Sequence, residues 1–191
     1  MKINFKEIYL APNLISLFRL LLFIPTQYVF SSLNDSQYFE FYLISIIFIA
    51  FASDLLDGFI ARKLNIITEF GKIIDPLSDK VLVLQFVLNL LLLNNLPLLY
   101  VVIVFTRDIL IFLGGIYLSQ RLNKVLPSNL LGKAAVFSIG VTIILSILAP
   151  GTLYFEWVMR ISILFLFVSF AAYVLRGTES LKVRSNELDK K

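Results

Sequence analysis

The chain has 191 residues and a net charge of +4; 59% of its residues are hydrophobic and only 16% are charged. A soluble domain is typically about 45–50% apolar and about 25% charged, and a chain of this size cannot bury so much apolar surface. The composition therefore excludes a disordered chain and an ordinary soluble domain, and it predicts an integral membrane protein. There is no Cys and no His, which excludes disulfides, thiolates, imidazole bases and His-ligated metals. Any catalysis must use other side chains or a hard metal ion held by oxygen ligands.

Apolar segments follow one another along the chain, each near the ~20 residues that a membrane-spanning helix needs. We place six of them, at residues 12–32, 38–62, 71–94, 98–119, 130–149 and 155–175. Turn-forming residues separate them, and no repeat or long linker intervenes, so we predict a single domain over residues 1–191. Residues 1–11 mix apolar side chains with Lys2, Lys6 and Glu7, which predicts a short interfacial helix.

Lys and Arg residues lie in alternate loops. They precede the first segment, surround the loops after the second and fourth segments, and fill the tail at residues 177–191, whereas the other three loops contain none. By the positive-inside rule, both termini and this tail are cytoplasmic. The sequence thus predicts an all-α membrane protein with six transmembrane helices.

Four aspartates lie within or next to the predicted membrane spans, where a charged side chain is energetically costly. Asp54 and Asp57 are three residues apart, and Asp75 and Asp79 are four apart, so each pair lies on one helix face. The predicted topology places both pairs in the cytoplasmic halves of their helices. Four carboxylates in a low dielectric repel one another unless a cation lies between them. Magnesium, manganese or calcium suits such ligands, and two divalent ions are typical of phosphoryl displacement.

The neighbouring residues fit a phosphate ligand. Gly58 and Ala61 keep the same face of the second segment free of bulk, and Gly71 does so at the start of the third. Arg62 offers a planar fork to a phosphate, and Thr68 lies in the loop beside the expected site.

Other polar residues in the spans have more than one interpretation. For Arg19, snorkelling or structural pairing competes with a role toward substrate. Arg107 and Asp108 form either a self-contained pair or part of a site. We expect Ser53 and Ser78 to be packing residues.

Together these residues resemble, without a mismatch, the signature of the CDP-alcohol phosphatidyltransferase family: Asp54-x2-Asp57-Gly58-x2-Ala61-Arg62-x8-Gly71-x3-Asp75-x3-Asp79. The segments 12–16, 68–71 and 75–80, with Arg19, resemble its bacterial phospholipid-synthesis branch. The six-helix topology extends the likeness over nearly the whole chain.

The resemblance implies an enzyme that transfers the phosphatidyl group of CDP-diacylglycerol to an alcohol and releases CMP. We expect direct displacement, because we find no separate nucleophile that would form a covalent intermediate. By motif position, Asp54, Asp57, Asp75 and Asp79 would ligate two Mg²⁺ or Mn²⁺ ions, with Asp79 also acting as the base. The residues that would line the cytidine and diphosphate pocket are Gly58, Ala61, Arg62, Thr68 and Gly71. The resemblance further implies a homodimer. The predicted topology places the active site on the cytoplasmic side of the inner membrane, and we expect no nucleic-acid partner.

The sequence specifies the acceptor alcohol less closely than the CDP-linked lipid. Glycerol 3-phosphate, which gives phosphatidylglycerophosphate, is the commonest bacterial acceptor, and Arg107, Arg121 and Lys133 are the basic residues available for its phosphate. That branch typically has Arg-Glu where this chain has Arg107-Asp108, a pair that resembles the eukaryotic-type cardiolipin synthases, which use phosphatidylglycerol. Serine and inositol phosphate are further alternatives.

An ion or metal transporter is the alternative of a different class, because intramembrane acids also line ion pathways. All four aspartates lie toward the cytoplasmic side of the membrane, however. The outer halves of the helices contain almost no polar residues that could pass an ion onward. Release of CMP from CDP-diacylglycerol would distinguish the two classes.

Overall fold

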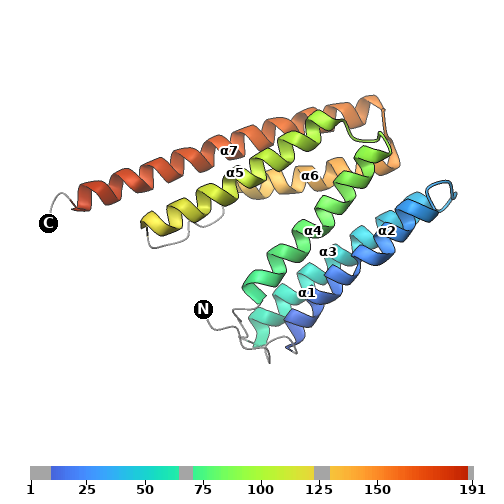
Figure 1. The fold of residues 1–191 in the computed structure, drawn as a ribbon, viewed down its shortest axis with the longest axis horizontal. Coiled ribbons are helices and arrows are strands. Elements are labelled where there is room, and N and C mark those ends of the chain that lie inside the picture. The colour runs from blue at the N-terminus through green and yellow to red at the C-terminus, as the bar shows by residue number, and fades with distance from the viewer. Residues whose placement is uncertain (1–9, 65–70, 123–129, 189–191) are drawn as a thin grey trace. The chain divides into compact units, whose positions relative to one another are not determined.

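The computed structural model describes residues 10–64, 71–122 and 130–188, and all regular secondary structure in these ranges is helical. The helices are α1 (Ala11–Leu21), α2 (Phe23–Ser32), α3 (Phe39–Leu64), α4 (Gly71–Leu92), α5 (Leu98–Leu122), α6 (Leu130–Leu148) and α7 (Leu153–Leu188). The chain divides into two compact units, Met1–Leu92 with α1–α4 and Leu93–Lys191 with α5–α7 (Figure 1). The single domain stays a prediction, and the predicted interfacial helix lies almost entirely outside the described residues.

Five stretches of the described helices are long and apolar enough to cross a membrane: Pro12–Ser32, Phe39–Ile60, Leu98–Leu122, Leu130–Leu148 and Leu153–Lys182. They correspond to five of the six predicted segments, and the chain is a helical membrane protein. The predicted third segment forms α4, whose 22 residues are long enough to span. Its first ten residues include Lys72, Asp75, Asp79 and Lys80. These charged residues make α4 less apolar than the five stretches above.

The first predicted segment is interrupted at Leu22, between α1 and α2. Pro25 causes the interruption, because it has no N–H to donate to the carbonyl four residues earlier and its ring crowds that carbonyl. The Leu22 N–H is shared between the carbonyls of Phe18 and Arg19, at 3.2 Å from each. The Gln85 side chain of α4 donates to the Phe23 carbonyl at 2.8 Å, so the neighbouring helix supports the backbone at the break.

In the first unit, α1 contacts both α3 and α4, and α2 contacts the same two helices. The buried face of α1 is polar, with Asn13, Ser16 and Arg19 at most 2% exposed, whereas Leu14 and Phe18 are exposed. A soluble helix has the opposite pattern. Here lipid can solvate the apolar face, so the polar residues turn toward protein partners. The polar face of α1 is what positions the site described below.

In the second unit, α7 contacts both α5 and α6. Hydroxyl groups join these helices: Tyr100 of α5 lies 2.9 Å from Ser162 of α7, and Ser162 lies 3.0 Å from Ser138 of α6. Hydrogen bonds of this kind between helices stabilise helix association in lipid, where apolar burial contributes little. The chain of three hydroxyls therefore fixes how α5, α6 and α7 pack.

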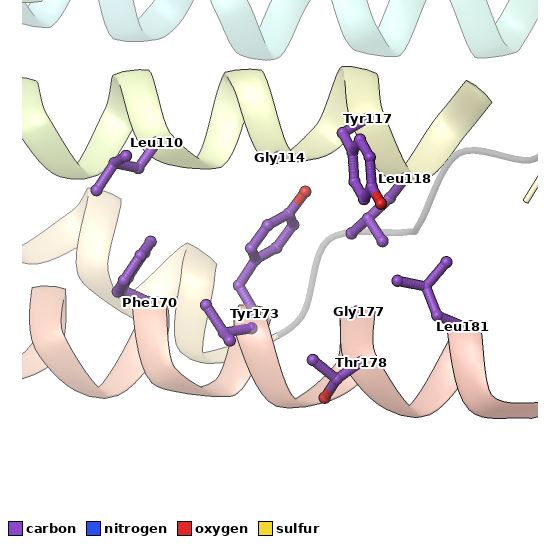
Figure 2. A pocket seen from close by; sticks show the side chains of 10 residues that line it. Leu110, Gly114, Tyr117, Leu118, Phe170, Tyr173, Gly177, Thr178 and Leu181 are labelled. Atoms are coloured by element: carbon purple, nitrogen blue, oxygen red, sulfur yellow. The ribbon is translucent and has the colours of Figure 1, made fainter. Parts of the chain in front are cut away.

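A groove of about 250 Å³ lies between α5 and α7 (Figure 2). Its lining is almost entirely apolar: Leu110, Gly114, Tyr117, Leu118, Phe170, Tyr173, Val174, Gly177, Thr178 and Leu181. Tyr173 extends from α7 toward α5, where Gly114 leaves room for its ring. Among the described residues, the Tyr173 hydroxyl has no hydrogen-bond partner.

The predicted breaks fit the observed turns where the structure describes them. Asn94 has φ +60° and Gly151 has φ +70°, a left-handed backbone that Gly and Asn tolerate better than other residues. The last helix is longer than predicted. It continues from Leu153 to Leu188, so most of the predicted tail at 177–191 extends α7.

Candidate active site

The centre of the candidate site is a single arginine. Arg19 of α1 is 1% exposed and is the largest of the fully buried residues that the structure describes. It lies one turn after Ser16 on the polar face of α1, which directs it between α3 and α4. A buried guanidinium is costly unless carboxylates and hydrogen-bond acceptors surround it, and α3 and α4 supply both.

Three of the four motif aspartates converge on this guanidinium. Nη2 of Arg19 lies 2.5 Å from Oδ2 of Asp57, and Nη1 lies 3.3 Å from Oδ1 of Asp54. Nη1 also donates to and pairs with Oδ1 of Asp79. The prediction that Asp54 and Asp57 share one face of α3 is therefore confirmed, as is their convergence with Asp79 of α4.

The three carboxylates differ in exposure. The Asp57 side chain is 7% exposed, whereas those of Asp54 and Asp79 are 49% and 48% exposed. Ser16 donates to Oδ2 of Asp57 at 3.1 Å, so α1 contributes two partners to this buried carboxylate. The cluster thus has a closed side at Asp57 and an open side at Asp54 and Asp79, where a ligand can approach.

Two serines belong to the site, contrary to our expectation that they only pack. Nε of Arg19 donates to Ser53 Oγ at 3.2 Å, and Nη1 donates to Ser78 Oγ at 3.5 Å. Each serine directly precedes a motif aspartate in the sequence, Asp54 or Asp79. That adjacency was the available signal, but it did not show that both hydroxyls face an arginine from a third helix.

Several predicted site residues lie wholly or partly outside the described residues. Thr68 is one of them, and so are the side chains of Ala61, Arg62 and Asp75. Their roles stay predictions. Gly71 is buried at the start of α4, and Gly58 is partly buried one residue after Asp57.

The three basic residues predicted to bind the acceptor belong to the second unit, and they differ in setting. Arg107 of α5 donates to Asp108 and to Ser169 of α7, at 2.7 Å in each case. Arg107 therefore bonds to a second helix as well as to its sequence neighbour. Arg121 is exposed, with its guanidinium 5.8 Å from the centre of the Tyr117 ring. Lys133 is exposed near the start of α6.

The donor set of the cluster suits a divalent cation, because carboxylate oxygens are the ligands that Mg²⁺ and Mn²⁺ prefer. The carboxylates already gather around one positive charge, that of Arg19. Among the described side chains, which do not include Asp75, no three acidic residues are arranged to hold a metal ion by themselves. A larger ligand set would have to include Asp75.

Comparison with known proteins identifies the family. The family model of CDP-alcohol phosphatidyltransferases matches residues 9–168. A CDP-diacylglycerol--glycerol-3-phosphate 3-phosphatidyltransferase of Aquifex aeolicus is 35% identical over 182 residues, covering 87% of this chain and 95% of the relative. The Bacillus subtilis protein of the same name is 32% identical over 142 residues, covering 70% of this chain and 72% of the relative. With three of the four motif aspartates converging on Arg19, the chain belongs to the CDP-alcohol phosphatidyltransferase family.

Proposed function

We propose that this chain transfers the phosphatidyl group of CDP-diacylglycerol to glycerol 3-phosphate, which yields phosphatidylglycerophosphate and CMP. The observation that carries the proposal is the convergence of Asp54, Asp57 and Asp79 from two helices, with an open side at Asp54 and Asp79. The names of the two relatives support glycerol 3-phosphate as the acceptor.

In the proposed reaction, the acceptor hydroxyl oxygen attacks the phosphorus that bears diacylglycerol. The bond from this phosphorus to the CMP oxygen breaks, and CMP leaves. The proton of the hydroxyl passes to Asp79, whose half-exposed carboxylate can reach a bound acceptor. Arg19, Ser53 and Ser78 position the carboxylates from the closed side.

Asp54, Asp57, Asp75 and Asp79 would hold the Mg²⁺ or Mn²⁺ ions, by motif position two of them. A bound divalent cation supplies positive charge that offsets the charge of the diphosphate and of the leaving CMP. Arg62 and Thr68, with Gly58, Ala61 and Gly71, would line the CDP-lipid pocket.

The proposed protein crosses the inner membrane six times, with both termini and the active site on the cytoplasmic side. The span that completes the six is α4, the third in chain order, whose 22 residues give a length of about 33 Å. Its charges lie in its first ten residues, at the end that the positive-inside rule makes cytoplasmic. The homodimer remains an expectation from the family.

The experiment that tests this function measures CMP release by the purified protein in detergent. It receives CDP-diacylglycerol, Mg²⁺ and one acceptor at a time: glycerol 3-phosphate, phosphatidylglycerol, serine or inositol phosphate. Asp79→Asn serves as the blank, and Asp35→Asn, which changes an exposed acid in the α2–α3 turn, is the matched control.

We expect glycerol 3-phosphate to support CMP release in the wild type and in Asp35→Asn, and Asp79→Asn to be inactive. Release only with phosphatidylglycerol would reassign the protein to cardiolipin synthesis. No release with any acceptor would refute the proposed transfer.

A further inference from the structure

The partners of Arg19 fall into two groups according to exposure. Nη2 and Nε lie against Asp57 and Ser53, which are 7% and 6% exposed. Nη1 also donates to the buried Ser78, but its carboxylate partners are Asp54 and Asp79, whose side chains are about half exposed. The guanidinium is therefore anchored on the closed side of the cluster and shares its remaining charge with the open side.

This division has a physical consequence. Asp54 and Asp79 come from different helices, and two carboxylates that meet in a low dielectric repel each other without a cation between them. Nη1 provides that charge. Because Nε and Nη2 keep their own partners, Nη1 can lose Asp54 and Asp79 without leaving the guanidinium uncompensated in the protein interior.

We propose that Arg19 is a tethered counter-cation that competes with the divalent cation. While no divalent cation is bound, Nη1 holds Asp54 and Asp79 together; when one binds, both carboxylates transfer to it and Arg19 stays on Asp57 and Ser53. Arg19 is thus a positioning residue, which keeps the ligand carboxylates gathered. The inference rests on the proposed function, since it requires a divalent cation at this site.

The competing explanation is that Arg19 only joins α1 to α3 and α4. The two explanations predict opposite effects on metal affinity. A purely structural arginine would, when removed, loosen the cluster and weaken metal binding. A competing arginine would, when removed, strengthen metal binding, because the metal no longer has to displace a charge.

The test measures the affinity of the purified protein for Mn²⁺ without any lipid substrate. The electron paramagnetic resonance signal of free Mn²⁺ reports how much of the ion remains unbound. We expect Arg19→Gln to bind Mn²⁺ roughly ten- to a hundredfold more tightly than the wild type, the usual range of coupling between two ligands. We also expect a lower melting temperature without metal, largely restored by Mn²⁺. Arg160→Gln is the control, because Arg160 also pairs with a carboxylate, Glu156, but on an exposed surface; it should leave Mn²⁺ affinity unchanged. Unchanged or weaker Mn²⁺ binding in Arg19→Gln overturns the proposal.

A second measurement uses the wild type, in case Arg19→Gln does not fold. In protein labelled with ¹⁵N-arginine, with Arg19→Lys used for assignment, saturating Mg²⁺ should shift the Nη1 signals of Arg19 and leave its Nε signal nearly in place. Arg19 signals that do not respond to Mg²⁺ overturn the proposal.

The outcomes separate this inference from the proposed function. Mn²⁺ binding that tightens in Arg19→Gln, without CMP release from any acceptor, supports the counter-cation and refutes the transfer reaction. CMP release that persists without divalent cations, in a protein that binds no Mn²⁺, supports the transfer and overturns the counter-cation.

Discussion

Arg19 of α1 and Asp57 of α3 form a buried ion pair, with Nη2 2.5 Å from Oδ2 and side chains that are 2% and 7% exposed. Ser16, one turn earlier on α1, donates to the same carboxylate oxygen at 3.1 Å. A motif aspartate is therefore also the point at which α1 docks onto α3. Stability and site geometry are linked at this residue.

Replacement of Asp57 by alanine should destabilise the protein strongly. Removal of one partner of a buried ion pair typically costs about 3–5 kcal/mol, and here it would leave Nη2 of Arg19 without its carboxylate partner. Asp54→Ala should cost less, because the Asp54 side chain is 49% exposed. The free energies of unfolding in detergent check this, with Glu156→Gln as the control: it breaks an exposed pair with Arg160 and should cost at most about 1 kcal/mol. Equal losses for Asp57→Ala and Asp54→Ala would contradict the docking role of Asp57.

Chelation of divalent cations should abolish CMP release. Without them, the charge of the diphosphate and of the leaving CMP is not offset. We expect release to fall to the level of Asp79→Asn in EDTA and to recover when excess Mg²⁺ or Mn²⁺ is added. Undiminished release in EDTA would show that the aspartates act without a metal ion.

The sequence-based role of Arg107 in acceptor binding gives a kinetic prediction. Its Nη atoms bond to Asp108 and Ser169, while Nε is buried without a hydrogen-bond partner among the described residues. An anion bound beside Arg107 would give that donor an acceptor. Arg107→Gln should raise the KM for glycerol 3-phosphate roughly tenfold or more, as expected for loss of a charged hydrogen bond, and leave the KM for CDP-diacylglycerol unchanged. Arg160→Gln, an exposed change, is the control; a KM that rises equally for both substrates would rule out a specific acceptor role.

The hydroxyl chain of the second unit should be energetically coupled. Ser162 contacts both Tyr100 and Ser138, so Ser162→Ala leaves two buried hydroxyls each without one partner. Such interhelical bonds in membrane proteins contribute about 0.6 kcal/mol on average and up to about 1.7 kcal/mol. A double-mutant cycle of Ser162→Ala with Tyr100→Phe, read from unfolding in detergent, should show non-additive losses. Strict additivity would mean that the two hydroxyls do not stabilise each other.

The groove between α5 and α7 gives opposite predictions for two of its residues. A Cβ at Gly114 would lie 3.2 Å from Cε1 of Tyr173, so Gly114→Val should destabilise the unit by about 1–3 kcal/mol through overpacking. Tyr173→Phe removes a hydroxyl that has no partner among the described residues, so stability should stay the same or rise by up to about 1 kcal/mol. Melting temperatures of both variants in detergent check this, and a marked loss in Tyr173→Phe would reveal an unrecognised partner.

Contacts along one helix were predictable from the sequence, and contacts between helices were predictable only where a motif fixed them. The spacing of Asp54 and Asp57 placed both on one face of α3. Pro25, in contrast, lay inside the predicted first span, and its consequence, a helix that breaks at Leu22, was not predicted. The tail beyond residue 177 was not predicted to extend α7, because its charged residues carry no apolar pattern that marks a membrane helix.

The lipid environment, the helices and the acidic motif could be predicted from the sequence, because composition, segment length and residue spacing are local properties. The partner of the aspartates became visible only in the folded structure. Arg19 lies 35 residues before Asp54 and 60 before Asp79, and no periodicity relates them. Their meeting depends on the polar face of α1 turning away from lipid and onto α3 and α4, because the cost of a buried charge favours a packing in which the guanidinium lies among carboxylates.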